Sequence, residues 1–197
     1  MKKVFAVALA MTVAVGMLAG CGSNDSVQGG AADGTITVVS REDGSGTRGA
    51  FIELFGIEEK NDAGEKIDNT TDTAEITNST AVMMTTVAGN DNAIGYVSLG
   101  SLNDSVKALS IDGVEASADN IKNGTYAVAR PFNIATGKEV SEVTKDFISF
   151  ILSEDGQAVV EENGYISQGN TGAFKSTEAE GKIVVAGSSS VTPVMEK

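Results

Sequence analysis

The 197-residue sequence contains no histidine, no tryptophan, two prolines and a single cysteine. Without histidine, the chain cannot build a Ser-His-Asp or Cys-His catalytic arrangement or a histidine-ligated zinc site. With one thiol it cannot form an intrachain disulfide. These absences remove the commonest hydrolase and zinc chemistries, so we expect a protein that is not an enzyme and that holds neither a metal nor a cofactor.

Positive charge is also scarce, because 14 Lys and Arg residues face 27 Asp and Glu residues and the formal net charge is −13. A nucleic acid is therefore excluded as an expected partner, since phosphate backbones attract clustered basic residues. A small anion remains a suitable ligand. It responds to donors and dipoles close to it, while salt screens charges beyond about 8 Å.

The first residues have the layout of an export signal. Lys2 and Lys3 precede an apolar run over residues 4–18, which is shorter than the roughly 20 residues of a membrane-spanning helix. The run ends in Leu18-Ala19-Gly20-Cys21, which resembles a bacterial lipoprotein box with Cys21 as the lipidated residue. We expect residues 1–20 to be cleaved and Cys21 to anchor the chain on the extracytoplasmic face of the cell membrane. The alternative is an ordinary signal peptide with an incidental cysteine.

Beyond a polar tether at residues 21–33, the sequence predicts alternating strands and helices and therefore a single α/β domain. The strands are expected at residues 36–39, 93–98, 106–111 and 125–129, and residues 57–73 are expected to form a loop. The helices are expected at residues 51–55, 81–88, 119–122, 141–152 and 154–163, with Ser79 and Gly89 bounding the second of them. The apolar positions of the helix over 141–152 are expected to pack into a core.

One short pattern occurs twice. Each copy is a β-branched run, then a loop rich in Gly, Ser and Thr, then the start of a helix. The first loop reads Arg41-Glu42-Asp43-Gly44-Ser45-Gly46-Thr47-Arg48. The second follows the run over residues 181–186 and reads Gly187-Ser188-Ser189-Ser190-Val191-Thr192-Pro193.

This pattern favours a tetrahedral oxyanion, because the first N–H groups of a helix lack internal partners and carry partial positive charge. In the first loop we expect Ser45, Gly46 and Thr47 to contact the ligand, and Arg41 to add a charge-assisted fork. Asp43 is expected to orient Arg41 and to favour a protonated phosphate over sulfate.

The expected donors of the second loop are Ser188, Ser189 and Ser190, with Pro193 near the first helical position. Arg48 is either a second cation or faces solvent. The alternative for each loop is a capped turn without a ligand, because helix caps use the same residue types.

The first loop resembles the central phosphate loop of the phosphate-binding substrate proteins of ABC transporters. Three later stretches resemble that family in the same order: Asn92-Ala93-Ile94-Gly95-Tyr96-Val97, Ala129-Arg130-Pro131 and residues 153–165. Residues 186–193 resemble the loop with which that family begins its mature chain. The resemblance implies that phosphate is bound by Arg41, Asp43, Ser45, Gly46 and Thr47 from one lobe and by Ser189 and Ser190 from the other.

By this resemblance we expect an α/β lobe like that of periplasmic binding proteins, with a mixed sheet flanked by helices. Because the opening loop lies at the end here, the arrangement is expected to be permuted and truncated. The expected parts are a signal peptide at 1–20, a tether at 21–33, the lobe at 34–180 and the start of a largely missing second lobe at 181–197. The implied function is extracytoplasmic binding of inorganic phosphate, as a monomer, for an ABC transporter permease.

Two other function classes stay open at this point. A hydrolase or phosphoryl-transfer enzyme is disfavoured, because the loop around Ser45 lacks the GxxxxGK[ST] pattern and the chain has no GxSxG elbow. A surface adhesion or scaffold module, or a fragment without function, would use both loops only as caps. An EF-hand is not expected either, because the acids at residues 61–72 lack its spacing.

Overall fold

The computed structural model describes residues 34–197. The expected signal peptide at 1–20, the tether at 21–33 and the lipidation residue Cys21 therefore lie outside the described residues. Residues Gly34–Lys197 form one compact unit, and all contacts described below lie within it. Within this unit no helix has both the length and the apolar character needed to cross a membrane.

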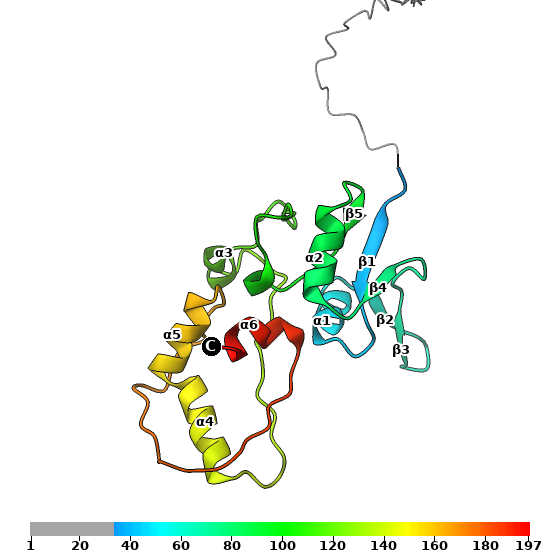
Figure 1. The fold of residues 1–197 in the computed structure, drawn as a ribbon. Helices are drawn as coiled ribbons and strands as arrows, with labels where there is room; N and C mark the ends of the chain where they lie inside the picture. The colour runs from blue at the N-terminus through cyan, green and yellow to red at the C-terminus, as the bar shows by residue number, and fades with distance from the viewer. Residues whose placement is uncertain (1–33) are drawn as a thin grey trace, which may run out of the picture. The chain divides into compact units, whose positions relative to one another are not determined.

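The central element is β1 (Thr37–Arg41), which lies between β4 (Glu75–Thr77) and β5 (Ala93–Ile94) in a parallel sheet (Figure 1). Parallel strands require long crossovers, which here contain α1 (Gly46–Leu54) and α2 (Thr80–Ala88). The second half of β1 is buried, with Val39 only 2% exposed. The predicted α/β class, a sheet flanked by helices, is confirmed.

Four of the predicted helices form where their capping residues place them. Ser79 caps α2 by accepting a hydrogen bond from Val82 N at 3.3 Å, and Gly89 ends that helix, as predicted. The others are α3 (Ala118–Lys122), α4 (Glu142–Leu152) and α5 (Glu154–Glu162), whose N-caps are Ser117, Ser141 and Ser153. A serine hydroxyl satisfies an N–H group that the helix itself leaves free, so it fixes where the helix begins.

One buried serine ends α4 and begins α5. Ser153 is 1% exposed, donates to Phe150 O at 2.7 Å and accepts from Gly156 N at 3.2 Å. A Cβ at Gly156 would overlap the Phe150 carbonyl oxygen, so glycine is required for this tight joint. No residue of α4 is buried, and the apolar side of this helix is at most half buried. The prediction that this side packs into a core is therefore wrong within the described residues.

The predicted loop at 57–73 is wrong for much of its length. It contains a hairpin of β2 (Glu58–Lys60) and β3 (Lys66–Asp68), and the unpredicted β4 follows it. Charged strands carry little hydrophobic pattern, which is why the sequence did not reveal them. The turn is closed instead by the side chain of Asn61, whose Oδ1 accepts from the N–H groups of Ala63 at 3.0 Å and Glu65 at 2.9 Å.

Three predicted β segments are not strands. Residues 106–111 contribute only an isolated bridge between Ile111 and Val114, and residues 125–129 contribute none. The run over 181–186 is extended but unpaired, with Val184 86% exposed. A strand exists only with a hydrogen-bonded neighbour, and among residues 34–197 no strand pairs with these segments beyond the single Ile111–Val114 bridge. The remaining elements are short helical turns: η1 (Leu99–Ser101), η2 (Ser189–Val191) and α6 (Thr192–Met195).

Arg48 ties the hairpin to the end of β1. Its guanidinium donates to Asp68 Oδ2 at 2.7 and 3.0 Å and to Arg41 O at 2.7 Å. Partial burial raises the pKa of Asp68, but hydrogen bonds from Thr70 and Arg48 outweigh burial and hold the pKa below its ordinary 3.8. Arg48 was expected to be a second cation or to face solvent. Its side chain is only 14% exposed, so it does not face solvent, and its contacts give it a structural role.

The ion pair between Arg48 and Asp68 makes the free energy of unfolding depend on pH in the acid range. We expect Asp68→Asn to lower the free energy of unfolding by about 1 kcal/mol at pH 7. Because the folded-state pKa is lowered, the stabilisation is present above the ordinary value of 3.8 and is lost as the pH falls through the lowered pKa. Urea unfolding at pH 7, 5 and 3 measures this. The difference between the two proteins should shrink only in acid, and an equal difference at all three pH values would contradict the assignment.

Candidate anion-binding site

The two predicted loops lie against each other in the folded chain. The hydroxyl of Thr47 is in hydrogen-bond contact with the hydroxyl of Ser190, although 143 residues separate them. Both residues are buried, at 9% and 7% exposure. A Cβ placed on Gly46 would lie 2.8 Å from Ser188 Oγ. The start of α1 and the second loop therefore form one continuous polar surface.

Arg41 lies at the carboxyl end of β1, and its side chain is 3% exposed. One terminal nitrogen, Nη1, donates to Ser189 Oγ at 2.9 Å and to Thr80 Oγ1 at 3.2 Å. The guanidinium is thus turned toward the second loop and toward the first residue of α2. Ligands of open α/β sheets usually bind at the carboxyl ends of the parallel strands, and Arg41 places a cation at such an end.

The opposite edge of the Arg41 guanidinium is held by different partners. Nε donates to Glu42 Oε2 at 2.9 Å and to Thr77 O at 3.2 Å, and Nη2 donates to Glu42 Oε1 at 3.1 Å and to Asn78 O at 3.3 Å. The hydrogen bond from Arg41 holds the pKa of the Glu42 carboxyl below its ordinary value. Asp43, rather than Glu42, was expected to orient Arg41. Its carboxylate is instead 99% exposed and faces Arg48 at 3.7 Å, so that expectation is wrong.

The N-terminus of α1 presents free backbone donors. Ser45 caps the helix, accepting from Arg48 N at 3.3 Å, and its own N–H donates to Glu42 O at 3.2 Å. Within residues 34–197, the N–H groups of Gly46 and Thr47 have no hydrogen-bond acceptor. Two unpaired amides at a helix start, beside the Thr47 hydroxyl, are suited to an oxyanion.

The second loop is fixed from two directions. Ser188 caps the turn η2 by accepting from Ser190 N at 3.2 Å, and the phenol of Tyr165 donates to Ser190 O at 2.6 Å. The hydroxyls of Ser189 and Ser190 are directed at Arg41 and Thr47. The structure thus brings the three serines predicted for the second loop together with Arg41, Gly46 and Thr47 of the first. Ser45 caps α1 next to Gly46, and the carboxylate of Asp43 is exposed.

Several residues at the site were not predicted as site residues. Tyr96 Oη lies 2.8 Å from Ser40 Oγ and accepts from Arg41 N at 3.0 Å, and Arg130 Nη2 donates to Gly46 O at 2.7 Å. Tyr96, Arg130 and Tyr165 all belong to segments singled out by the family resemblance, so that signal was present in the sequence. Thr80 carried no signal beyond its position after a helix cap.

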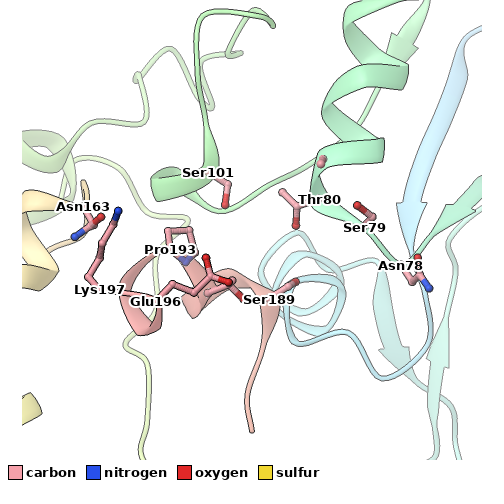
Figure 2. Close-up of a pocket in the computed structure, with 11 residues that line it drawn as sticks. Asn78, Ser79, Thr80, Ser101, Asn163, Ser189, Pro193, Glu196 and Lys197 are labelled. Carbon is pink, nitrogen blue, oxygen red and sulfur yellow. The ribbon is translucent and has the colours of Figure 1, made fainter. Parts of the chain in front are cut away.

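An open groove of about 620 Å³ adjoins this surface. Figure 2 shows Thr80 and Ser189 lining one part of it, with Asn163 and Lys197 farther along. Seven of its eleven lining residues carry hydroxyl or amide side chains. Among the described residues no group of three His, Cys, Asp or Glu side chains could hold a metal ion. The chemistry available is hydrogen-bond donation from hydroxyls, amides and the buried guanidinium of Arg41, with the charged side chains of Glu196 and Lys197 on the groove wall.

Known proteins resemble this chain in sequence and in fold. The sequence model of the PBP superfamily domain matches residues 18–155. The chain is similar to phosphate-binding protein PstS 2 of Streptococcus agalactiae serotype V, with 60% identity over 198 residues that cover 100% of this chain and 66% of that protein. The chain therefore spans about two thirds of the length of that relative.

Two solved structures are also similar. The phosphate-binding protein of a phosphate ABC transporter from Streptococcus pneumoniae TIGR4 has a TM-score of 0.68 and 53% identity, covering 83% of this chain and 63% of its own. A Clostridium perfringens protein solved with bound phosphate has a TM-score of 0.57 and 43% identity, covering 67% and 51%. The predicted resemblance to phosphate-binding substrate proteins is thereby confirmed, and the chain belongs to the PBP superfamily.

Proposed function

We propose that this chain binds inorganic phosphate outside the cytoplasm for delivery to an ABC-type importer. The observation that carries the proposal is the convergence of two hydroxyl- and amide-rich loops on the buried guanidinium of Arg41. It is supported by relatives named for phosphate binding. The proposed contact residues are Arg41, Asp43, Ser45, Gly46, Thr47, Ser188, Ser189 and Ser190.

The donor set matches the chemistry of a small oxyanion. Phosphate offers only oxygen atoms, which accept from the Arg41 guanidinium, from the Gly46 and Thr47 amides and from serine and threonine hydroxyls. A hydroxyl that now accepts from Arg41 can rotate and donate to the ligand instead. The exposed Asp43 is the proposed acceptor for the proton of a protonated phosphate, which sulfate lacks at neutral pH.

Binding also requires movement. The direct contact between Thr47 and Ser190 occupies the place where a ligand would bridge the two loops. We propose that the second loop moves away from α1 to admit phosphate and closes on it afterwards, as in hinge closure between lobes. The division into a lobe at 34–180 and the start of a second lobe at 181–197 belongs to the same proposal, as do the signal peptide at 1–20 and the tether at 21–33.

The cellular setting is proposed from the sequence. Cys21 is the proposed lipid attachment that holds the protein at the outer face of the cell membrane, where a permease would receive phosphate from a monomer. We propose binding without catalysis, because the chain has no histidine and the site offers no paired nucleophile and base.

Isothermal titration calorimetry on the full chain tests the function. We expect saturable heat when inorganic phosphate is added at pH 7, and no heat when sulfate is added at the same ionic strength. The contrast follows from the proposed acceptor role of Asp43, because a carboxylate repels an anion that cannot donate a hydrogen bond. Equal heats from the two anions would contradict the phosphate assignment. The absence of heat with either anion would overturn phosphate binding by this chain.

A further inference from the structure

The guanidinium of Arg41 has two edges with different kinds of partner. Charged and backbone acceptors hold the Nε and Nη2 edge: both carboxylate oxygens of Glu42, Thr77 O and Asn78 O. Within residues 34–197, the Nη1 edge is held by neutral hydroxyls alone, those of Ser189 and Thr80. The strongest partner of Arg41 therefore lies on the edge away from the second loop.

We propose that Glu42 is a positioning residue for anion binding, holding Arg41 by a two-point fork so that its Nη1 edge faces the ligand position between the loops. The inference rests on the proposed phosphate site. It assigns to Glu42 the role of orienting Arg41, which was expected of Asp43. Glu42 itself does not contact the ligand. It acts through the orientation and the charge balance of Arg41.

Orientation is the first physical argument. An arginine side chain has several rotatable bonds, and fixing it costs conformational entropy. A bidentate carboxylate pair satisfies two parallel N–H groups at once and leaves the guanidinium plane a single orientation. With that edge saturated, Nη1 is the part whose partners an incoming anion can replace, because hydroxyls that give up an acceptor role can become donors.

Charge balance is the second argument. The Arg41 side chain is 3% exposed, and a buried cation without a counter-ion is unfavourable. Glu42 supplies a permanent counter-ion, which the lowered pKa of its carboxyl keeps ionised. Arg41 can therefore stay buried and aligned before phosphate arrives. A carboxylate in the ligand's place would instead compete with phosphate, but Glu42 lies on the edge of Arg41 away from Ser189.

The test is calorimetric titration of inorganic phosphate into the full chain and into variants at pH 7. We expect Glu42→Gln to weaken phosphate binding about tenfold, because an amide cannot accept two charge-assisted hydrogen bonds. Glu139→Gln removes the same charge at an exposed position, and its affinity should equal that of the wild type. Tighter binding or unchanged binding by Glu42→Gln would overturn the inference.

A double-mutant cycle separates positioning from a general structural effect. In an Arg41→Lys background the fork is already gone, so adding Glu42→Gln should change phosphate affinity less than about twofold. A full tenfold loss in that background would show that Glu42 acts elsewhere, and would overturn the inference. Failure of the wild-type chain to bind phosphate would instead count against the proposed function, so the two failures are distinguishable.

Discussion

Arg41→Lys is expected to weaken phosphate binding about 100-fold, because lysine keeps the charge but loses the planar fork. Arg41 makes hydrogen bonds through all three of its nitrogens, from Glu42 on one edge to Ser189 on the other. An ammonium group cannot reach both edges at once. The pair to Glu42 and the donor toward the second loop therefore cannot coexist in the variant. Isothermal titration calorimetry of the full chain with inorganic phosphate measures the loss.

Arg48→Lys is the matched control, since Arg48 also pairs with a carboxylate but holds the hairpin rather than the second loop. We expect this variant to lose stability in urea while its phosphate affinity changes less than about threefold. If Arg41→Lys and Arg48→Lys lowered affinity equally, Arg41 would have no special place at the ligand and the proposed site would be wrong.

Gly46→Ala is expected to weaken phosphate binding about 30-fold without unfolding the protein, because its methyl group would overpack the contact between the loops. The added Cβ would lie 2.8 Å from Ser188 Oγ and 2.9 Å from Ser188 Cβ. Alanine is otherwise favourable at the start of a helix. The loss should therefore come from forcing the second loop away from the Gly46 and Thr47 amides, and it is measured by the same titration.

Gly49, also in α1, provides a control for the effect of a glycine-to-alanine change on this helix. A Cβ on Gly49 would meet nothing within 4 Å. Gly49→Ala should leave phosphate affinity unchanged and raise the free energy of unfolding by up to about 1 kcal/mol, because glycine is the poorer helix former.

A second change should restore part of what Gly46→Ala removes. Ser188→Gly deletes both atoms that the new methyl group would strike, at the cost of the cap on η2. We expect the double variant to recover part, but not all, of the lost affinity, because Ser188 is itself a proposed contact residue and its side chain caps η2. Suppose that the double variant recovered no phosphate affinity and that Gly49→Ala also lowered this affinity. The loops would then not meet around the ligand in the way the structure places them.

Local sequence determined where most elements begin and where the donors of the site lie. Serine side chains cap the starts of α2 to α5. The Ser79 cap was predicted, because a cap depends only on its neighbours in the chain, and the other three helices were predicted to within a residue or two of where they begin. The donor character of Gly46, Thr47, Ser189 and Ser190 was also local, since it depends on residue type and on the start of a helix.

The tertiary structure decided which elements and side chains meet. Residues 181–186 have the composition of a strand but remain unpaired, because pairing depends on a neighbour that no local pattern specifies. Asp43 and Glu42 are adjacent carboxylates of similar chemistry, and only the path of the loop puts Glu42 on Arg41 and Asp43 in solvent. The contact of Thr47 with Ser190 arises in the same way, because hydroxyls 143 residues apart become partners only when the chain has folded.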